Sequence, residues 1–174
     1  MHRALIPAVA FAALLVASEA HAQITVSPQT SPALGTTVRG SSATTFSIST
    51  SGTVTRLSGN AIRLSTSSVT APTISISCGL LNLGGLCALR PMRVTITSAA
   101  TAPMSITTFR VANLSGTTWR TGSAPAEASV LVFELNAMGL ISTVSFTLGM
   151  DVVLAAGAAS GGQTFPYTVT VQLL

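Results

Sequence analysis

Apolar and polar side chains alternate along much of the chain, and the clearest examples lie near its end. The segments 144–154 and 165–173 both place an apolar residue at nearly every second position. A period of two puts successive side chains on opposite faces of an extended strand. Because the turn-rich segment 155–162 joins the two runs, we expect them to pair as a β-hairpin with a long connection.

The same alternation recurs in shorter runs between turn residues, at 24–27, 45–50, 54–57, 61–65, 73–78, 92–97, 105–111 and 130–135. Ser51-Gly52 lies between two of these runs and predicts a second hairpin. The segment 113–128 loses the alternation and is expected to be a long loop. No apolar period typical of a helix extends over three turns after residue 22. About nine or ten short antiparallel strands predict an all-β fold, an immunoglobulin-like β-sandwich.

The first residues have a different pattern, which is typical of an exported protein. A basic start precedes an apolar run over 4–17, and Ala20-His21-Ala22 forms a small-x-small cleavage site. The run is too short to span a bilayer comfortably, so we expect a cleaved signal peptide of residues 1–22. The product would be a single domain over 23–174 with no transmembrane segment, located in the periplasm, on the outer surface or outside the cell.

Removing this leader also changes the chemistry that the chain offers. Both histidines leave with it, and the sequence has no lysine, so a nucleophile would lack the usual side-chain bases. The remaining carboxylates are Glu127, Glu134 and Asp151, and they form no calcium-binding motif. We therefore expect no catalytic residue, no metal site and no cofactor, and a protein that is not an enzyme.

The two cysteines, Cys78 and Cys87, are predicted to form a disulfide, since an isolated pair in an exported protein is typically oxidised. Closing so short a loop stabilises the fold by ~2.5–3 kcal/mol in the chain-entropy estimate.

Arginines outnumber acids after the leader by seven to three, which leaves a net charge of about +4. The arginines are scattered and no aromatic residues interleave with them. This distribution favours a loose attraction to anionic envelope polymers over specific recognition of a nucleic acid.

Two segments are candidate contact surfaces. Trp119 and Arg120 in the long loop could stack on a sugar, although a tryptophan at such a place more often caps the core. The segment 24–34, with Ile24, Val26 and Leu34, could act as a donor strand for another copy of the chain, or pair within its own sandwich.

Glycine and strand motifs complete the sequence evidence. They are ALGTTVRG at 33–40, FTLG at 146–149, the glycine-bearing segment 157–162 and YTVTV at 167–171. In these motifs the chain resembles the bacterial family called "domain of unknown function 4402", a group of exported all-β proteins. The resemblance implies a sandwich similar to fimbrial subunits, without a catalytic site.

The function expected from these features is that of a non-enzymatic structural or adhesive cell-surface protein, such as a fimbria- or pilus-like subunit that binds its own copies. The alternative is a monomeric periplasmic or secreted module that binds a glycan or an envelope polymer.

Overall fold

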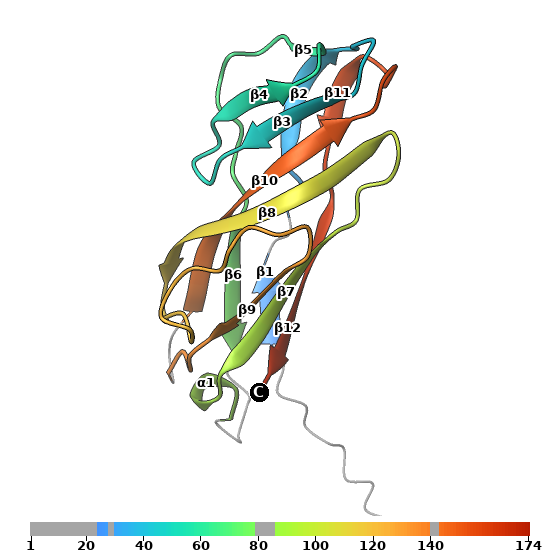
Figure 1. Cartoon of the computed structure of the whole chain (residues 1–174). Helices are drawn as coiled ribbons and strands as arrows, with labels where there is room; N and C mark the ends of the chain where they lie inside the picture. The colour runs from blue at the N-terminus through green and yellow to red at the C-terminus, as the bar shows by residue number, and fades with distance from the viewer. Residues whose placement is uncertain (1–23, 28–29, 79–85, 140–142) are drawn as a thin grey trace, which may run out of the picture.

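The computed structural model describes residues 24–27, 30–78, 86–139 and 143–174, and the expected signal peptide with Gln23 lies outside this part. Within the described residues the chain forms twelve strands and one helical turn (Figure 1). The elements are β1 (Ile24–Ser27), β2 (Ala33–Val38), β3 (Thr44–Ile48), β4 (Val54–Ser58), β5 (Ile62–Arg63), β6 (Thr73–Cys78), α1 (Leu86–Leu89), β7 (Met92–Ser98), β8 (Met104–Ser115), β9 (Leu131–Leu135), β10 (Thr143–Leu154), β11 (Gly161–Thr164) and β12 (Tyr167–Leu173). No helix in the described part is long and apolar enough to cross a membrane.

Strand β10 is the centre of the largest sheet, which has six strands. One edge of β10 pairs with β6 in its first half and with β3 in its second half, and the other edge pairs with β8. Beyond these neighbours, β1 pairs with β6 and β4 pairs with β3. All of these pairings are antiparallel. The long strands β8 and β10 therefore run through both halves of the molecule (Figure 1).

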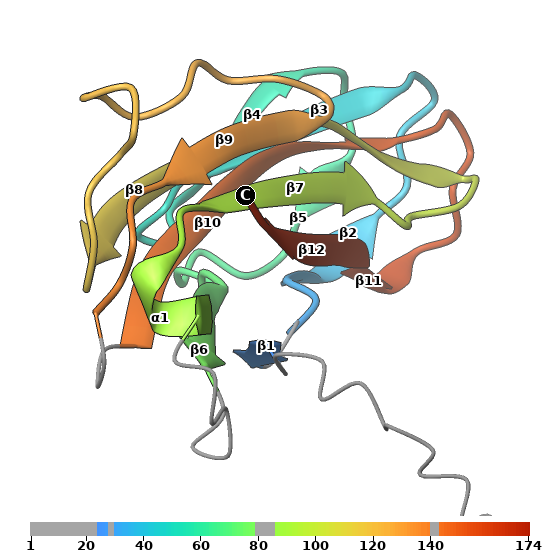
Figure 2. The same ribbon diagram turned by 90° about the horizontal axis from the view of Figure 1, so that it is seen from below.

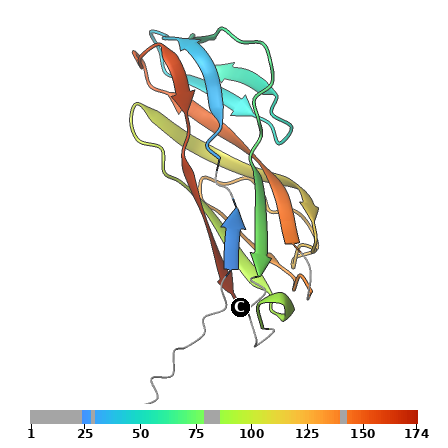
Figure 3. The same ribbon diagram turned by 180° about the vertical axis from the view of Figure 1, so that it is seen from behind.

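Two three-stranded antiparallel sheets complete the fold, with the orders β11-β2-β5 and β12-β7-β9. Figures 2 and 3 show the molecule from below and from behind, with β1 beside β12, a contact that brings an edge of the largest sheet to an edge of a small one. The buried side chains of the three sheets form one hydrophobic cluster, which includes Leu34, Phe46, Phe133, Phe146 and Val169. Fully burying a side chain of this size contributes about 1.5–3 kcal/mol.

The all-β class predicted from the alternation is confirmed, and so are the strand periods and the hairpin of β3 and β4 around Ser51-Gly52. The closing hairpin was a wrong prediction. The run 144–154 is β10, and both of its edges are already occupied by β3, β6 and β8. The last strand, β12, pairs with β7 instead, and the intervening β11 pairs with β2.

Three smaller expectations also change. The strand expected at 61–65 is only the two-residue β5. The loop expected at 113–128 starts later, because β8 continues to Ser115. Within β8, Asn113 takes a positive φ of 55°, which asparagine tolerates, next to a register shift in the pairing with β10. A helical turn, α1, contains Cys87 where no helix was expected, and it is too short to leave an apolar period in the sequence.

Candidate functional site

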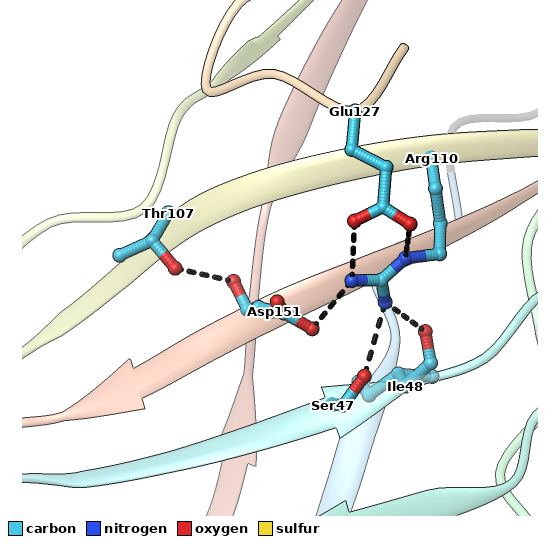
Figure 4. Close-up of polar contacts among 6 residues, drawn as sticks. All are labelled: Ser47, Ile48, Thr107, Arg110, Glu127 and Asp151. Atoms are coloured by element: carbon cyan, nitrogen blue, oxygen red, sulfur yellow. Dashed lines mark hydrogen bonds and ion pairs between the residues drawn. The ribbon is translucent and has the colours of Figure 1, made fainter. Parts of the chain in front are cut away.

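A polar cluster on β8, β10 and β3 gathers around the guanidinium of Arg110 (Figure 4). Its Nε and Nη2 atoms donate to Glu127 at 2.9 and 3.1 Å, and Nη2 also donates to Asp151 at 2.8 Å. Its Nη1 donates to the Ser47 hydroxyl at 3.0 Å. We call these four residues the Arg110 cluster. The hydrogen bonds that Arg110 donates to both carboxylates raise its pKa above the usual value, with the bonds to Glu127 as the largest cause, although partial burial opposes them.

Gly149 explains how Arg110 reaches so many partners. Strand β10 lies between β8 and β3, and Gly149 is the residue of β10 that stands opposite Arg110. A Cβ atom at Gly149 would lie 2.9 Å from Arg110 Cγ and 2.8 Å from the carbonyl oxygen of Ile48. The missing side chain therefore lets the arginine cross β10 and bind the third strand. This geometry is a clamp between strands, and two of the three carboxylates singled out from the sequence are used in it.

The third carboxylate, Glu134 on β9, pairs with two arginines. Arg93 donates to Glu134 Oε1 at 2.8 Å, and Arg120 Nη1 lies 3.4 Å from Oε2. The pKa of Glu134 is lowered, with the hydrogen bond from Arg93 as the largest cause, and its partial desolvation opposes the shift. The contact of Arg120 with Glu134 ties the predicted binding loop to β9, and the contact of Arg93 ties β7 to β9.

Trp119 in that loop is half-buried and belongs to the edge of the core. Its ring lies edge-on to Phe133, with a centroid distance of 5.4 Å and an interplanar angle of 75°. The backbone of Trp119 forms a β-bridge with Leu135, and the N–H of Arg120 donates to the carbonyl of Glu134. The structure therefore places Trp119 and Arg120 together, beside β9. Trp119 contacts Phe133 and Leu135, and Arg120 contacts Glu134.

The residues of the predicted donor segment lie in two different sheets. Ile24 and Val26 are half-buried on β1 and stand opposite Cys78 and Ile76 of β6 in the same chain, whereas Leu34 on β2 is fully buried. Pairing with a second chain stays a prediction.

The predicted disulfide between Cys78 and Cys87 is confirmed. It joins the end of β6, next to β1, to the helical turn before β7. Within the described residues, no three side chains of metal-ligating type come together.

A recess that the sequence did not single out opens where β4, an edge of the largest sheet, approaches β5, an edge of a small sheet. Its volume is about 390 Å³. We call it the β4–β5 recess. The residues that line it are Phe46, Val54, Arg56, Ala61, Ile62, Arg63, Ser65 and Thr66. Because β5 has only two residues, it is too short to cover the inner face of β4, and this leaves the recess open.

The register of the two strands aims both arginines into the space between the sheets. Arg56 stands opposite Phe46, which is buried, and Arg63 stands opposite Thr37, which is also buried. Residues that face each other across a strand pair share a face of the sheet. Arg56 Nη1 donates to the carbonyl of Ala61 at 3.1 Å. Neither arginine has a carboxylate partner among the described residues.

The turn between the two strands is held by a buried hydroxyl. Thr44 Oγ1 accepts hydrogen bonds from the backbone N–H groups of Asn60 at 3.0 Å and Ala61 at 2.9 Å. Gly59 takes a φ of +78°, and a Cβ there would lie 2.3 Å from the carbonyl oxygen of Ala43. The two arginines are therefore carried by a turn of fixed geometry. Their positions on either side of a Ser-Gly-Asn turn, with no acid nearby, were the sequence signal that could have identified them.

A second hollow of about 410 Å³ adjoins the first, since both are lined by Arg63 and Ser65. Its other lining residues include Ser67, Ser68 and Thr70. Arg63 is held at the boundary, because Nε donates to the carbonyl of Leu34 at 2.5 Å and Nη2 to that of Ser67 at 2.7 Å. The two hollows therefore adjoin at Arg63, and we call them together the track.

Comparison with protein-family models, curated proteins and solved structures gives no match for this chain. The resemblance to the family "domain of unknown function 4402" therefore stays a prediction.

Proposed function

We propose that this protein is an exported, non-enzymatic adhesive protein of the cell surface, and that it binds its target at the β4–β5 recess on an immunoglobulin-like β-sandwich. The observation that carries the proposal is the open junction between β4 and β5, a recess of about 390 Å³ within the usual size range of ligand pockets. The disulfide between Cys78 and Cys87 is compatible with an oxidising compartment outside the cytoplasm.

The surroundings of the recess favour binding. Leu57, Ile62 and Leu64 are large apolar side chains near the recess, and each is more than half exposed to solvent. Exposed apolar groups beside unpaired polar groups are typical of recognition surfaces. The described carboxylates, in contrast, are all engaged by arginines in ion pairs, so they are poorly placed to act as general acids or bases.

The test fills the opening without touching the core. Thr66 lines the recess and is exposed, so Thr66→Trp should block it, and Ser123→Trp adds the same ring at an exposed loop position away from it. Residues 23–174 and both variants are incubated with envelopes from the producing cells, and the bound fraction is measured. We expect Thr66→Trp to lose binding and Ser123→Trp to keep it. Equal retention of both variants would refute the recess as the binding site.

A second candidate, a fimbria-like subunit that pairs with its own copies, is favoured by one observation. Strand β1 has four residues, pairs with β6 alone among the described strands, and keeps Ile24 and Val26 only half-buried. Such a strand is a weakly held edge that could exchange between copies. Deletion of 23–32 should then abolish multimers in light scattering after size exclusion, and multimers that persist unchanged would rule out this exchange.

A further inference from the structure

We propose that the ligand of the β4–β5 recess is an acidic polysaccharide, whose carboxylate groups are bound by Arg56 and Arg63. This inference rests on the proposed function, and it adds the chemical class of the target. The charge distribution, the positions of the two guanidiniums, the adjacency of the two hollows and the chemistry of their walls support it.

Charge is divided unevenly over the described residues. The three carboxylates are paired with Arg93, Arg110 and Arg120. Arg56 and Arg63 have no such partner, and Arg39 follows directly after β2, the strand that pairs with β5. Arg39, Arg56 and Arg63 therefore give the part of the molecule around β2, β4 and β5 an excess of positive charge, because the carboxylates of Glu127 and Asp151 are bound by Arg110. Such a region attracts anions.

The fold also keeps the carboxylate of Asp151 away from Arg56. Asp151 on β10 stands opposite Ser47 of β3, which in turn stands opposite Thr55 of β4. Successive residues of a strand point to opposite faces, so Arg56 lies on the other face of the sheet from Asp151. Among the described residues its guanidinium makes one hydrogen bond, to the carbonyl of Ala61, which leaves most of its donors for a ligand.

Two adjoining hollows favour an extended ligand over a single small anion. Arg56 lines the first hollow, and Arg63 lines both. A polymer chain that lies along the track would pass the two guanidiniums in succession. Each guanidinium can hold a carboxylate through paired N–H···O bonds, a geometry that a planar fork favours.

The walls of the track suit sugars. Ser65, Thr66, Ser67, Ser68 and Thr70 supply small hydroxyl groups that can exchange hydrogen bonds with sugar hydroxyls. Ile62, which lines the first hollow and is more than half exposed, offers apolar surface to the C–H faces of sugar rings. A nucleic acid would instead be expected to stack its bases on aromatic side chains. Among the described residues that line the two hollows, Phe46 is the one aromatic residue, and it is buried.

The experiment uses residues 23–174 and titration calorimetry with oligogalacturonate, polyphosphate of similar length and neutral dextran. We expect oligogalacturonate to bind, polyphosphate to bind more weakly, and dextran not to bind. Arg56→Gln should weaken binding by about tenfold or more, since it removes a charged hydrogen-bond donor. Arg93→Gln is the matched control, because it removes the same charge from an exposed arginine of the β7–β9 face.

Several outcomes would overturn the inference. An equal loss with Arg93→Gln would show that only the net charge matters, and stronger binding of polyphosphate would assign the site to phosphate polymers. If no polyanion binds while Thr66→Trp still abolishes envelope binding, the ligand class is wrong and the proposed function stands. If Thr66→Trp also has no effect, both fail. Arg63 also donates hydrogen bonds to two backbone carbonyls, so the binding of Arg63→Gln is compared only if its melting temperature equals that of the parent. The binding of Arg56→Gln decides the test by itself.

Discussion

Replacement of Gly149 by alanine tests whether a single missing side chain permits the Arg110 cluster. The new Cβ would meet the Ile48 carbonyl oxygen at 2.8 Å, the Thr50 nitrogen at 2.9 Å and Arg110 Cγ at 2.9 Å. Two of these three atoms are backbone atoms, at the end of β3 and in the turn after it, so they cannot move aside by changing a rotamer. Either β10 and β3 separate locally, or Arg110 leaves its position over β10.

The magnitude follows from these two responses. Overpacking of a well-packed site costs about 1–3 kcal/mol. Loss of the hydrogen bond from Arg110 to Asp151, whose side chains are only 20% and 16% exposed, costs about 1.5–3 kcal/mol if the arginine is displaced. Alanine itself recovers about 0.5–1 kcal/mol of backbone entropy relative to glycine in a strand. We therefore expect Gly149→Ala to lower the free energy of unfolding by about 2 kcal/mol, since either response is sufficient.

The assay is urea denaturation followed by the fluorescence of Trp119, together with the melting temperature, which should fall by about 4–8 °C. Gly162→Ala is the matched control, because Gly162 is also in a strand, has no positive φ, and has no atom within 4 Å of the added Cβ. It should leave stability unchanged or slightly higher. A Gly149→Ala protein as stable as the parent would refute the reasoning, and so would an equal loss in Gly162→Ala.

A double-mutant cycle separates the two responses. If alanine at 149 displaces Arg110, then Arg110→Gln should cost less in the Gly149→Ala background than in the parent, because its contacts are already lost. Equal costs in both backgrounds would assign the effect to strand separation alone.

Three further predictions concern single interactions. Burial raises the pKa of Tyr167 to about 12, so the folded state disfavours the phenolate, and the resulting stability is present below pH ~10 and lost as pH rises toward 12. The sequence has one tyrosine and no lysine, so Tyr167→Phe should remove most of the fall in melting temperature between these pH values. A fall as large as that of the parent would contradict the assignment of this effect to Tyr167. Replacing both Cys78 and Cys87 by serine should lower the free energy of unfolding by ~2.5 kcal/mol through the closed loop alone, and a urea midpoint equal to that of the parent would argue against it. Trp119→Ala should lower stability by about 2 kcal/mol, measured by circular dichroism, because the ring packs on Phe133 and the core. Binding of oligogalacturonate by that variant should be unchanged, and a selective loss of binding with intact folding would favour the loop as the contact surface.

Much of the fold follows from local pattern. The alternation of apolar and polar residues predicts the strands and their buried faces, because a strand has a period of two whatever it pairs with. The hairpin of β3 and β4 also follows, since its turn at Ser51-Gly52 is short and leaves the chain few other partners. The disulfide is equally local, because only two cysteines exist.

The partners of the other strands were decided by the tertiary structure. The run 144–154 could have paired with 165–173 by pattern alone, yet β10 is buried along its length and gives its edges to β3, β6 and β8. Alternation states which face of a strand is buried, and it carries no information about which edge is free. Competition among all strands for the same core settles that question.

The candidate site depends on the same non-local choices. By itself the sequence determined that the chain is basic, rich in strands and poor in catalytic side chains. It could not show that Arg110 would bind two carboxylates and reach Ser47 across Gly149, or that Arg56 and Arg63 would line an open recess without a carboxylate partner among the described residues. Those contacts depend on strand order and register, and both are set by how the three sheets share one core.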